Sequence, residues 1–304
     1  MAKWTAADMP AQTGRAFVVT GTGGLGYEDA LALARAGAEV ILAGRNAASG
    51  AEAVAQIKAA VAGAKVRFAL LDLSDLVSVR RFSDTLAKER TSLDGLINNA
   101  GVMNPPKRME TVDGFELQLG TNYLGHFLLT AGLLPLLKRG KDPRVVTLSS
   151  VAARQGDIQF DDLNFTDAYV PMKAYAQSKI ACLMFALELQ KRSDAGNWGI
   201  GSLAAHPGVS RTNLLLNTPG GAGAAGVVRK LLSFLFQPVW QGALPTLFAA
   251  TAPDAKAGGY YGPDRLGETR GYPAEARIPA PAQDPETLRR LWIESERLTG
   301  ARFA

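Results

Sequence analysis

The chain has 304 residues, of which 47% are apolar and 20% are charged, and its formal net charge is +5. This composition fits a globular protein and excludes a disordered or fibrous one. The sequence has no run of five or six like charges, so we expect no nucleic-acid-binding arm.

Three further absences narrow the class of protein. The single cysteine, Cys182, excludes an internal disulfide, which suits a cytoplasmic protein. Residues 1–14 contain no apolar signal core, and no stretch of 18 apolar residues follows, so we expect no integral membrane segment. One cysteine and two histidines are too few for a zinc cluster, so we expect no metal site.

Strand and helix patterns alternate through the first 206 residues. Apolar runs predict strands at 15–20, 38–43, 66–71, 93–97, 144–149 and 200–205. Helical spacing predicts helices at 25–36, 46–62, from Ser74 or Asp75 onward, at 112–138 and at 173–191. The near-continuous apolar strands are typical of a parallel sheet covered on both faces. Repeated right-handed β-α-β crossovers then predict an α/β protein with a Rossmann-type doubly wound sheet.

The pattern changes after residue 206. We expect a flexible segment at 218–226, an apolar stretch at 227–240, a helix at 242–252, a last edge strand at 258–262, an irregular Pro-rich segment at 273–285 and an amphipathic helix at 286–298. The sheet would then have about seven strands. We predict a single domain over 1–304, with a cofactor-binding core at 15–206, a substrate loop or lid at 207–257 and a C-terminal strand and helix at 258–304.

A glycine-rich loop lies between the first strand and the first helix. Gly21, Gly23 and Gly26 fit the pattern G-x-G-x-x-G, with Gly24 and Leu25 between them. Backbone amides at a helix N-terminus bind a pyrophosphate, and glycines let the phosphates approach closely. A simple tight turn is the alternative, but the position between strand and helix favours a dinucleotide site.

The end of the second strand bears on which dinucleotide binds. An acid there is typical of NAD sites and an arginine of NADP sites. This chain has Arg45 and no acid, so we predict NADP rather than NAD. An ordinary surface cation is the alternative interpretation of Arg45.

Several motifs together resemble those of the short-chain dehydrogenase/reductase family. They are Asn98-Asn99-Ala100-Gly101, Asn122 to Phe127 (NYLGHF), Ser149-Ser150, Tyr175-x-x-x-Lys179 and His206 to Val209 (HPGV). The similarity runs from Arg15 to about Leu214, and more weakly to Gly300. The amino-acid sequences of these segments resemble those of the retinol-dehydrogenase-like and protochlorophyllide-reductase-like branch. The glycine loop is one residue shorter than the family pattern T-G-x-x-x-G-x-G, which leaves Arg45 with less help in holding a 2′-phosphate.

Tyr175 and Lys179 are four residues apart on a predicted helix and therefore share a face. A free tyrosine hydroxyl has a pKa of about 10, and a nearby ammonium favours the phenolate and lowers that pKa. General acid–base catalysis is most efficient when the pKa lies near the working pH. The pair is therefore a candidate proton donor and acceptor, although the same two residues also occur on ordinary amphipathic helices.

The resemblance implies roles for other residues. Ser150 would hydrogen-bond the substrate oxygen, while Ser149 would cap a turn. Asn122 would hold a water molecule that links Lys179 to solvent; a buried asparagine that satisfies backbone groups is the alternative. The remaining residues implied to bind the cofactor are Asp72 and Leu73 at the adenine, Asn99, Ala100 and Gly101 along it, and Tyr175, Lys179, Pro207, Gly208, Val209 and Thr212 at the nicotinamide half.

These residues predict hydride transfer between NADP(H) and an alcohol or carbonyl compound. The apolar segment after residue 210 suggests a bulky hydrophobic substrate, although it could equally pack on the sheet or another subunit, or touch a membrane surface. The alternatives are reduction of an enone carbon–carbon double bond and a non-catalytic dinucleotide sensor. The resemblance also implies a homo-oligomer, a dimer or tetramer, formed through the helices around Tyr123 and Tyr175.

Overall fold

The computed structural model describes residues 3–210 and 237–303. Their strands form one twisted sheet in the order β3-β2-β1-β4-β5-β6-β7-β8. The strands are β1 (Ala16–Thr20), β2 (Glu39–Gly44), β3 (Val66–Leu70), β4 (Gly95–Asn98), β5 (Arg144–Leu148), β6 (Gly201–Ala205), β7 (Tyr260–Arg265) and β8 (Arg270–Glu275). All neighbours pair in parallel except β7 and β8, which form an antiparallel hairpin. The doubly wound α/β prediction is thus confirmed.

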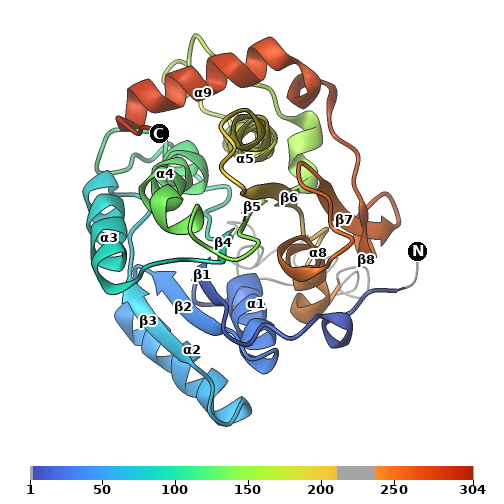
Figure 1. Cartoon of the computed structure of the whole chain (residues 1–304). Coiled ribbons are helices and arrows are strands. Elements are labelled where there is room, and N and C mark those ends of the chain that lie inside the picture. The colour runs from blue at the N-terminus through green and yellow to red at the C-terminus, as the bar shows by residue number, and fades with distance from the viewer. Residues whose placement is uncertain (1–2, 211–236, 304) are drawn as a thin grey trace.

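Helices cover both faces of the sheet (Figure 1). They are α1 (Gly24–Arg35), α2 (Ala47–Ala60), α3 (Leu76–Glu89), α4 (Gly125–Leu137), α5 (Pro171–Ala195), α8 (Val239–Thr251) and α9 (Pro285–Thr299). One apolar cluster joins the sheet to α3, α4 and α5, and a second joins it to α1, α2 and α8. The apolar runs of the strands follow from this arrangement, because a strand between two helix layers has no solvated face.

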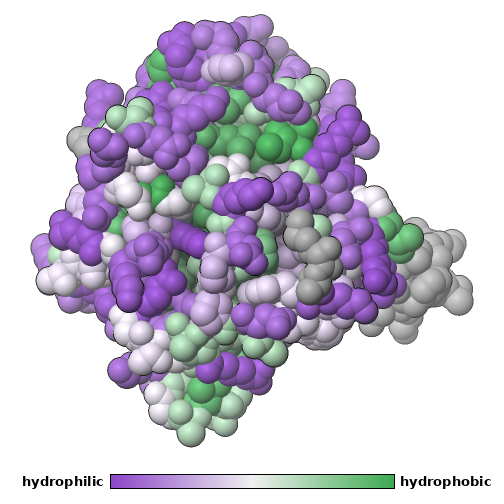
Figure 2. Space-filling view, turned by 45° about the vertical axis from the view of Figure 1, so that its right-hand side comes forward, coloured by the Kyte–Doolittle hydropathy of each residue, from purple (hydrophilic) through white to green (hydrophobic). Residues whose placement is uncertain are grey.

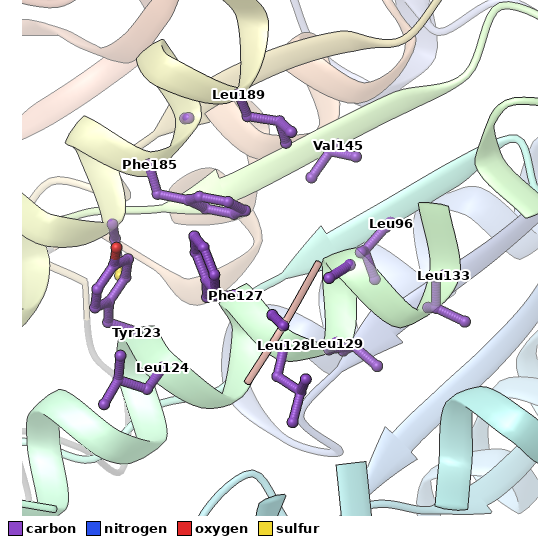
Figure 3. Packing of buried hydrophobic residues seen from close by; sticks show 14 of the residues in the cluster. Leu96, Tyr123, Leu124, Phe127, Leu128, Leu129, Leu133, Val145, Phe185 and Leu189 are labelled. Atoms are coloured by element: carbon purple, nitrogen blue, oxygen red, sulfur yellow. The ribbon is translucent and has the colours of Figure 1, made fainter. Parts of the chain in front are cut away.

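The side of the sheet that carries α4 and α5 has a third layer. The C-terminal helix α9 runs across the outside of α5. Figure 3 shows Tyr123 from the turn just before α4, Phe127 of α4 and Phe185 of α5 packed together, with Leu96 and Val145 of the sheet to one side of them. On the outer surface, hydrophilic side chains cover most of the face in Figure 2, and pale apolar ones gather at the lower end, where the alanine-rich α2 lies.

Sequence patterns placed several helix ends correctly. Asn46 caps α2, since its Oδ1 accepts a hydrogen bond from Ser49 N at 3.0 Å. Gly37, with φ +90°, follows α1 and closes it as expected. Of the two residues considered for the cap of α3, Asp75 fills the position, because its Oδ1 accepts from Val77 N and Ser78 N.

Two details differ from the predictions. The described residues form eight strands, slightly more than the expected number of about seven, and β8 forms the edge instead of the strand predicted near 258–262, which corresponds to β7. Pro273 in β8 made the segment look irregular, but an edge strand tolerates a residue without an N–H donor. The helix expected from Val112 starts several residues later, because Gly114, with φ +82°, makes a turn there.

Candidate active site

The glycine loop connects β1 to α1 and needs its glycines for two different reasons. Gly21 and Gly24 have φ values of +97° and +54°, which favour glycine. A Cβ on Gly26 would lie 2.4 Å from the Gly21 carbonyl oxygen and 2.6 Å from Asn99 Nδ2. The first-turn amides of α1 have no partner within their own helix and are therefore available to an anion.

Thr20 fastens this loop to the end of β4. Its Oγ1 accepts hydrogen bonds from Asn99 N at 2.9 Å and Ala100 N at 3.0 Å, and its carbonyl accepts from Asn99 Nδ2 at 2.7 Å. The hydroxyl also lies 2.9 Å from His126 Nε2. His126 Nδ1 lies 2.9 Å from the Asn122 carbonyl, which can only accept, so Nδ1 carries the proton and Nε2 is the unprotonated nitrogen that faces the Thr20 hydroxyl.

His126, for which the sequence pattern indicates no role, joins the glycine loop to the turn that holds Asn122. The ring is fully buried. Burial lowers the pKa of His126 to about 4; the charge on Lys179 acts in the same direction, and the hydrogen bond to Asn122 opposes it. The imidazole is therefore neutral at pH 7. A lone histidine in an apolar helix carries no sequence pattern that indicates this contact.

A cavity of about 680 Å³ opens between the glycine loop and the start of α5. Most residues proposed from the sequence line it: Gly21, Gly23, Gly24, Leu25, Arg45, Asp72, Leu73, Asn99, Ala100, Gly101, Ser150, Tyr175, Lys179, Pro207, Gly208 and Val209. Gly26 lies behind the loop and Asn122 is buried behind the wall. Thr212 and residues 211–236 of the predicted lid lie outside the described residues.

Tyr175 and Lys179 enter the cavity from the first turns of α5. Their side chains are mostly buried, and the Lys179 Nζ lies 5.9 Å from the centre of the Tyr175 ring. Nζ donates a hydrogen bond to the Leu148 carbonyl at the end of β5, at 3.0 Å. Pro171 at the first position of α5 favours the helix start that places both residues here.

Asn122 lies in a π-helical turn, Leu119–Leu124, just before α4. Its Oδ1 accepts from Val102 N at 2.7 Å, and its Nδ2 donates to the Val102 carbonyl at 3.0 Å and to Ser178 Oγ at 2.9 Å. A Cβ on Gly101 would lie 2.9 Å from Asn122 Oδ1 and 3.7 Å from Lys179 Nζ. The side-chain amide therefore satisfies backbone groups, as the alternative interpretation of the sequence had it.

The two serines after β5 have different partners from those expected. Ser150, not Ser149, caps the short 3₁₀ helix η3 (Val151–Gln155), because its Oγ accepts from Ala152 N at 3.2 Å. Ser149 is buried, and its Oγ donates to the Lys179 carbonyl at 2.8 Å. Since Ser150 uses its oxygen for the cap, its O–H remains available to donate into the cavity.

The far end of the cavity lies over the adenosine side of the predicted site. Arg45 follows β2 and is exposed at the rim. Asp72 follows β3, and its Oδ1 accepts from Ser74 N at 2.9 Å and from Ser74 Oγ at 2.6 Å. No carboxylate ends β2, and Arg45 is the charged side chain that follows it at the cavity rim.

No group of three possible metal ligands occurs among residues 3–210 and 237–303. Within the same part of the chain, none of the helices has the length and apolar composition needed to cross a membrane.

The comparisons with known proteins agree with this geometry. The family model for short chain dehydrogenases matches residues 15–219. Polyprenol dehydrogenase of Mus musculus is 42% identical over 303 residues, covering 96% of this chain and 86% of its own. Retinol dehydrogenase 13 of Homo sapiens is 40% identical over 294 residues, covering 94% of this chain and 85% of its own.

A crystal structure of an uncharacterized protein from Mycobacterium Paratuberculosis superposes with a TM-score of 0.83 at 40% identity, covering 100% of both chains. A short chain dehydrogenase from Shigella flexneri complexed with NADP has the same fold, with a TM-score of 0.65 at 22% identity over 83% of this chain and 98% of its own. The chain therefore belongs to the short-chain dehydrogenase/reductase family of oxidoreductases, on its retinol-dehydrogenase-like branch.

Proposed function

We propose that this oxidoreductase interconverts a bulky hydrophobic alcohol and its ketone or aldehyde, with NADP(H) as the hydride partner. One observation carries the proposal. The side chains of Tyr175 and Lys179 line the same cavity as the glycine loop at the start of α1. A proton donor and a phosphate-binding loop in one crevice are what hydride transfer to a carbonyl needs.

The cavity residues fit a dinucleotide. The first-turn amides of α1 suit a pyrophosphate, and Gly21 and Gly101 leave room where a side chain would strike Asn99 or Asn122. Arg45 at the end of β2 suits a 2′-phosphate, and the lack of an acid there disfavours NAD. When bound, the nicotinamide would supply or accept the hydride.

The chain's own residues would handle the proton. Tyr175 donates its phenolic proton to the substrate oxygen during reduction and takes it back during oxidation. Lys179 is held by the Leu148 carbonyl so that its ammonium stays beside the tyrosine ring. Ser150 directs its O–H at the oxygen on which negative charge develops.

Asn122 supports this arrangement from behind. Because both ends of its amide bind Val102 and Ser178, it fixes the backbone at Gly101 against the Lys179 ammonium. We assign it a positioning role through these contacts.

The substrate preference follows from the apolar part of the cavity. Met103, Met172 and Val151 line it, and Met172 stays 46% exposed at the rim. Such a wall suits an apolar ligand. The relatives named polyprenol dehydrogenase and retinol dehydrogenase point to long apolar alcohols of this kind.

Substitution of Tyr175→Phe tests the proposal. We expect kcat/KM to fall by roughly 10²–10⁴-fold, the usual value of a general acid–base group, while dinucleotide binding persists. Tyr272→Phe, on β8 beside Lys3, is the matched control and should leave activity unchanged. Undiminished turnover in the Tyr175→Phe variant would refute the mechanism.

A panel of bulky ketones, alcohols and enones, run with NADPH/NADP and NADH/NAD, tests the cofactor and the bond that is reduced. We expect carbonyl reduction and faster turnover with NADPH. Equal rates with NADH would overturn the role of Arg45, and reduction of the carbon–carbon bond alone would favour the enone reductase.

A further inference from the structure

The loop at residues 207–209 rests on the turn between β7 and β8. Val209 N donates to the Thr269 carbonyl at 2.7 Å. Gly208 has φ +62°, and a Cβ on it would lie 2.4 Å from that same carbonyl oxygen. The hairpin turn therefore supports the loop that lines the cavity beside Ser150.

His206, at the start of this loop, is fully buried, and its hydrogen bonds fix its tautomer. Gly208 N donates to Nδ1 at 3.2 Å, so Nδ1 has no proton. Burial lowers the pKa of His206 despite the opposing effect of Glu268, so the ring is neutral at pH 7 and Nε2 carries the proton. Nε2 then donates to Glu268 Oε2 at 3.0 Å.

Glu268 connects this histidine to the helix that Ser150 caps. Its Oε2 lies 2.6 Å from Arg154 Nη2, and Arg154 is on η3. Its Oε1 accepts from Arg277 N at 3.1 Å. Although burial acts to raise it, the hydrogen bonds from His206, Arg277 N and Arg154 lower the pKa of Glu268 to about 2. The carboxylate is thus charged, and it connects His206 of the loop to Arg154 of η3.

We propose that Glu268 is a positioning residue for hydride transfer. By accepting from His206 it keeps the imidazole in the tautomer that receives the Gly208 N–H, and by binding Arg154 it fixes the Ser150 helix against the same loop. The loop beside the nicotinamide and the serine beside the substrate oxygen would then keep a fixed position relative to each other. This inference rests on the proposed function, because it assigns the 207–209 loop to the nicotinamide.

The test compares a whole dinucleotide with a fragment that lacks nicotinamide. Calorimetry would measure binding of NADP and of 2′-phospho-ADP-ribose to the wild-type chain and to Glu268→Gln. We expect NADP binding to weaken about tenfold, the effect of one lost charge-assisted hydrogen bond, and fragment binding to be unchanged. In the same variant kcat should fall more than KM for the alcohol rises, because the alcohol itself does not contact Glu268.

Two further variants complete the design. Glu275→Gln, on the same hairpin but paired with Lys256, should change neither affinity. Arg154→Gln removes one partner of Glu268 at a more exposed site; it should show a smaller loss in the same direction, and it carries the test if Glu268→Gln does not fold.

The outcomes separate the two hypotheses. If the wild-type chain binds NADP but the folded variants lose neither ligand, or lose both equally, the role of Glu268 is wrong and the proposed function stands. If the wild-type chain binds neither NADP nor NAD, the proposed function fails and the inference fails with it.

Discussion

Helix α5 and the segment made of the π-helical turn Leu119–Leu124 and α4 contribute to two regions of opposite character. At the cavity they present Asn122, Ser178 and Lys179, whose polar atoms bind one another or nearby backbone. Away from it they present Tyr123, which packs on Phe127 and Phe185, and these two rings pack against Trp292 of α9 and Phe303. One turn of chain therefore places Asn122 in the functional region and its neighbour Tyr123 in the structural one.

This contrast bears on how the chain can assemble. The homo-oligomer expected from the sequence would use the helices around Tyr123. Tyr123, Phe127 and Phe185 are each no more than 2% exposed, because α9 and Phe303 cover them. A partner subunit cannot reach these side chains while α9 is in place, so any such contact must use other residues. The aromatic cluster, defined as these three residues with Trp292 and Phe303, serves stability.

The largest expected effect comes from Trp292→Ala, which should lower stability without changing dinucleotide binding. Trp292 is 1% exposed and lies 4.4 to 5.8 Å, between ring centres, from Phe303, Phe127 and Phe185. Removing a buried tryptophan costs about 3–5 kcal/mol of unfolding free energy, which urea denaturation would measure. At a temperature where the variant is folded, dinucleotide affinity should be unchanged. Ile293→Ala, at an exposed neighbouring position, is the control and should cost under about 0.5 kcal/mol.

The functional region could be predicted because many of its residues directly follow the carboxyl ends of parallel strands. The glycine loop follows β1, Ser150 follows β5 and Pro207 follows β6. The carboxyl ends of parallel strands meet at one edge, so residues far apart in sequence gather there once the topology is known. The spacing of Tyr175 and Lys179 identified the helix that completes the cavity.

The supporting contacts could not be predicted from the same sequence. His126 contacts Thr20 across 106 residues, and His206 contacts Glu268 across 62. Neither pair forms a motif, since tertiary packing alone brings them together. The amphipathic pattern of α9 likewise showed an apolar face but not the aromatic residues it would meet. Asp29 of α1 is buried, and both its carboxylate oxygens lack a partner among the described residues, which nothing in its helical position foretold.

The pH dependence of stability also distinguishes the two regions. Both buried histidines support the cavity, and neither lies in the aromatic cluster. The pKa of an unfolded histidine is about 6.5, whereas the pKa of His126 in the folded protein is about 4. The unfolded state thus binds more protons in that window, and stability falls as the pH drops from 6.5 to 4. At about 1.4 kcal/mol per pH unit, His126 alone accounts for about 3 kcal/mol. His206, with its pKa also lowered, acts in the same direction.

Urea unfolding at several pH values between 7 and 4 would measure this loss, and NMR titration of the two imidazole rings would assign it. With only two histidines in the chain, one variant is enough to identify the signals. A His126 ring that titrates near 6.5 would contradict the neutral, buried link between Thr20 and Asn122.

The smallest expected effect lies at the contact between the aromatic cluster and α9. Ser295 Oγ donates its one proton to the Leu291 carbonyl at 2.7 Å, so the Tyr123 hydroxyl, 2.5 Å away, is the donor to Ser295. Burial raises the pKa of Tyr123, which keeps that proton in place. Ser295→Ala then leaves a buried donor unsatisfied and should cost about 1–3 kcal/mol. Tyr123→Phe removes the donor and leaves Ser295 bonded to Leu291, so it should cost less.

A double-mutant cycle measures the difference. In the Tyr123→Phe background, Ser295→Ala should cost clearly less than it does in the wild-type chain, since no donor remains to be left unpaired. Equal costs in both backgrounds would mean that the Tyr123–Ser295 hydrogen bond adds nothing to the docking of α9, and that the aromatic rings alone hold the helix. Because neither hydroxyl faces the cavity, dinucleotide binding should be the same in all four proteins, which keeps the stability of one region separate from the chemistry of the other.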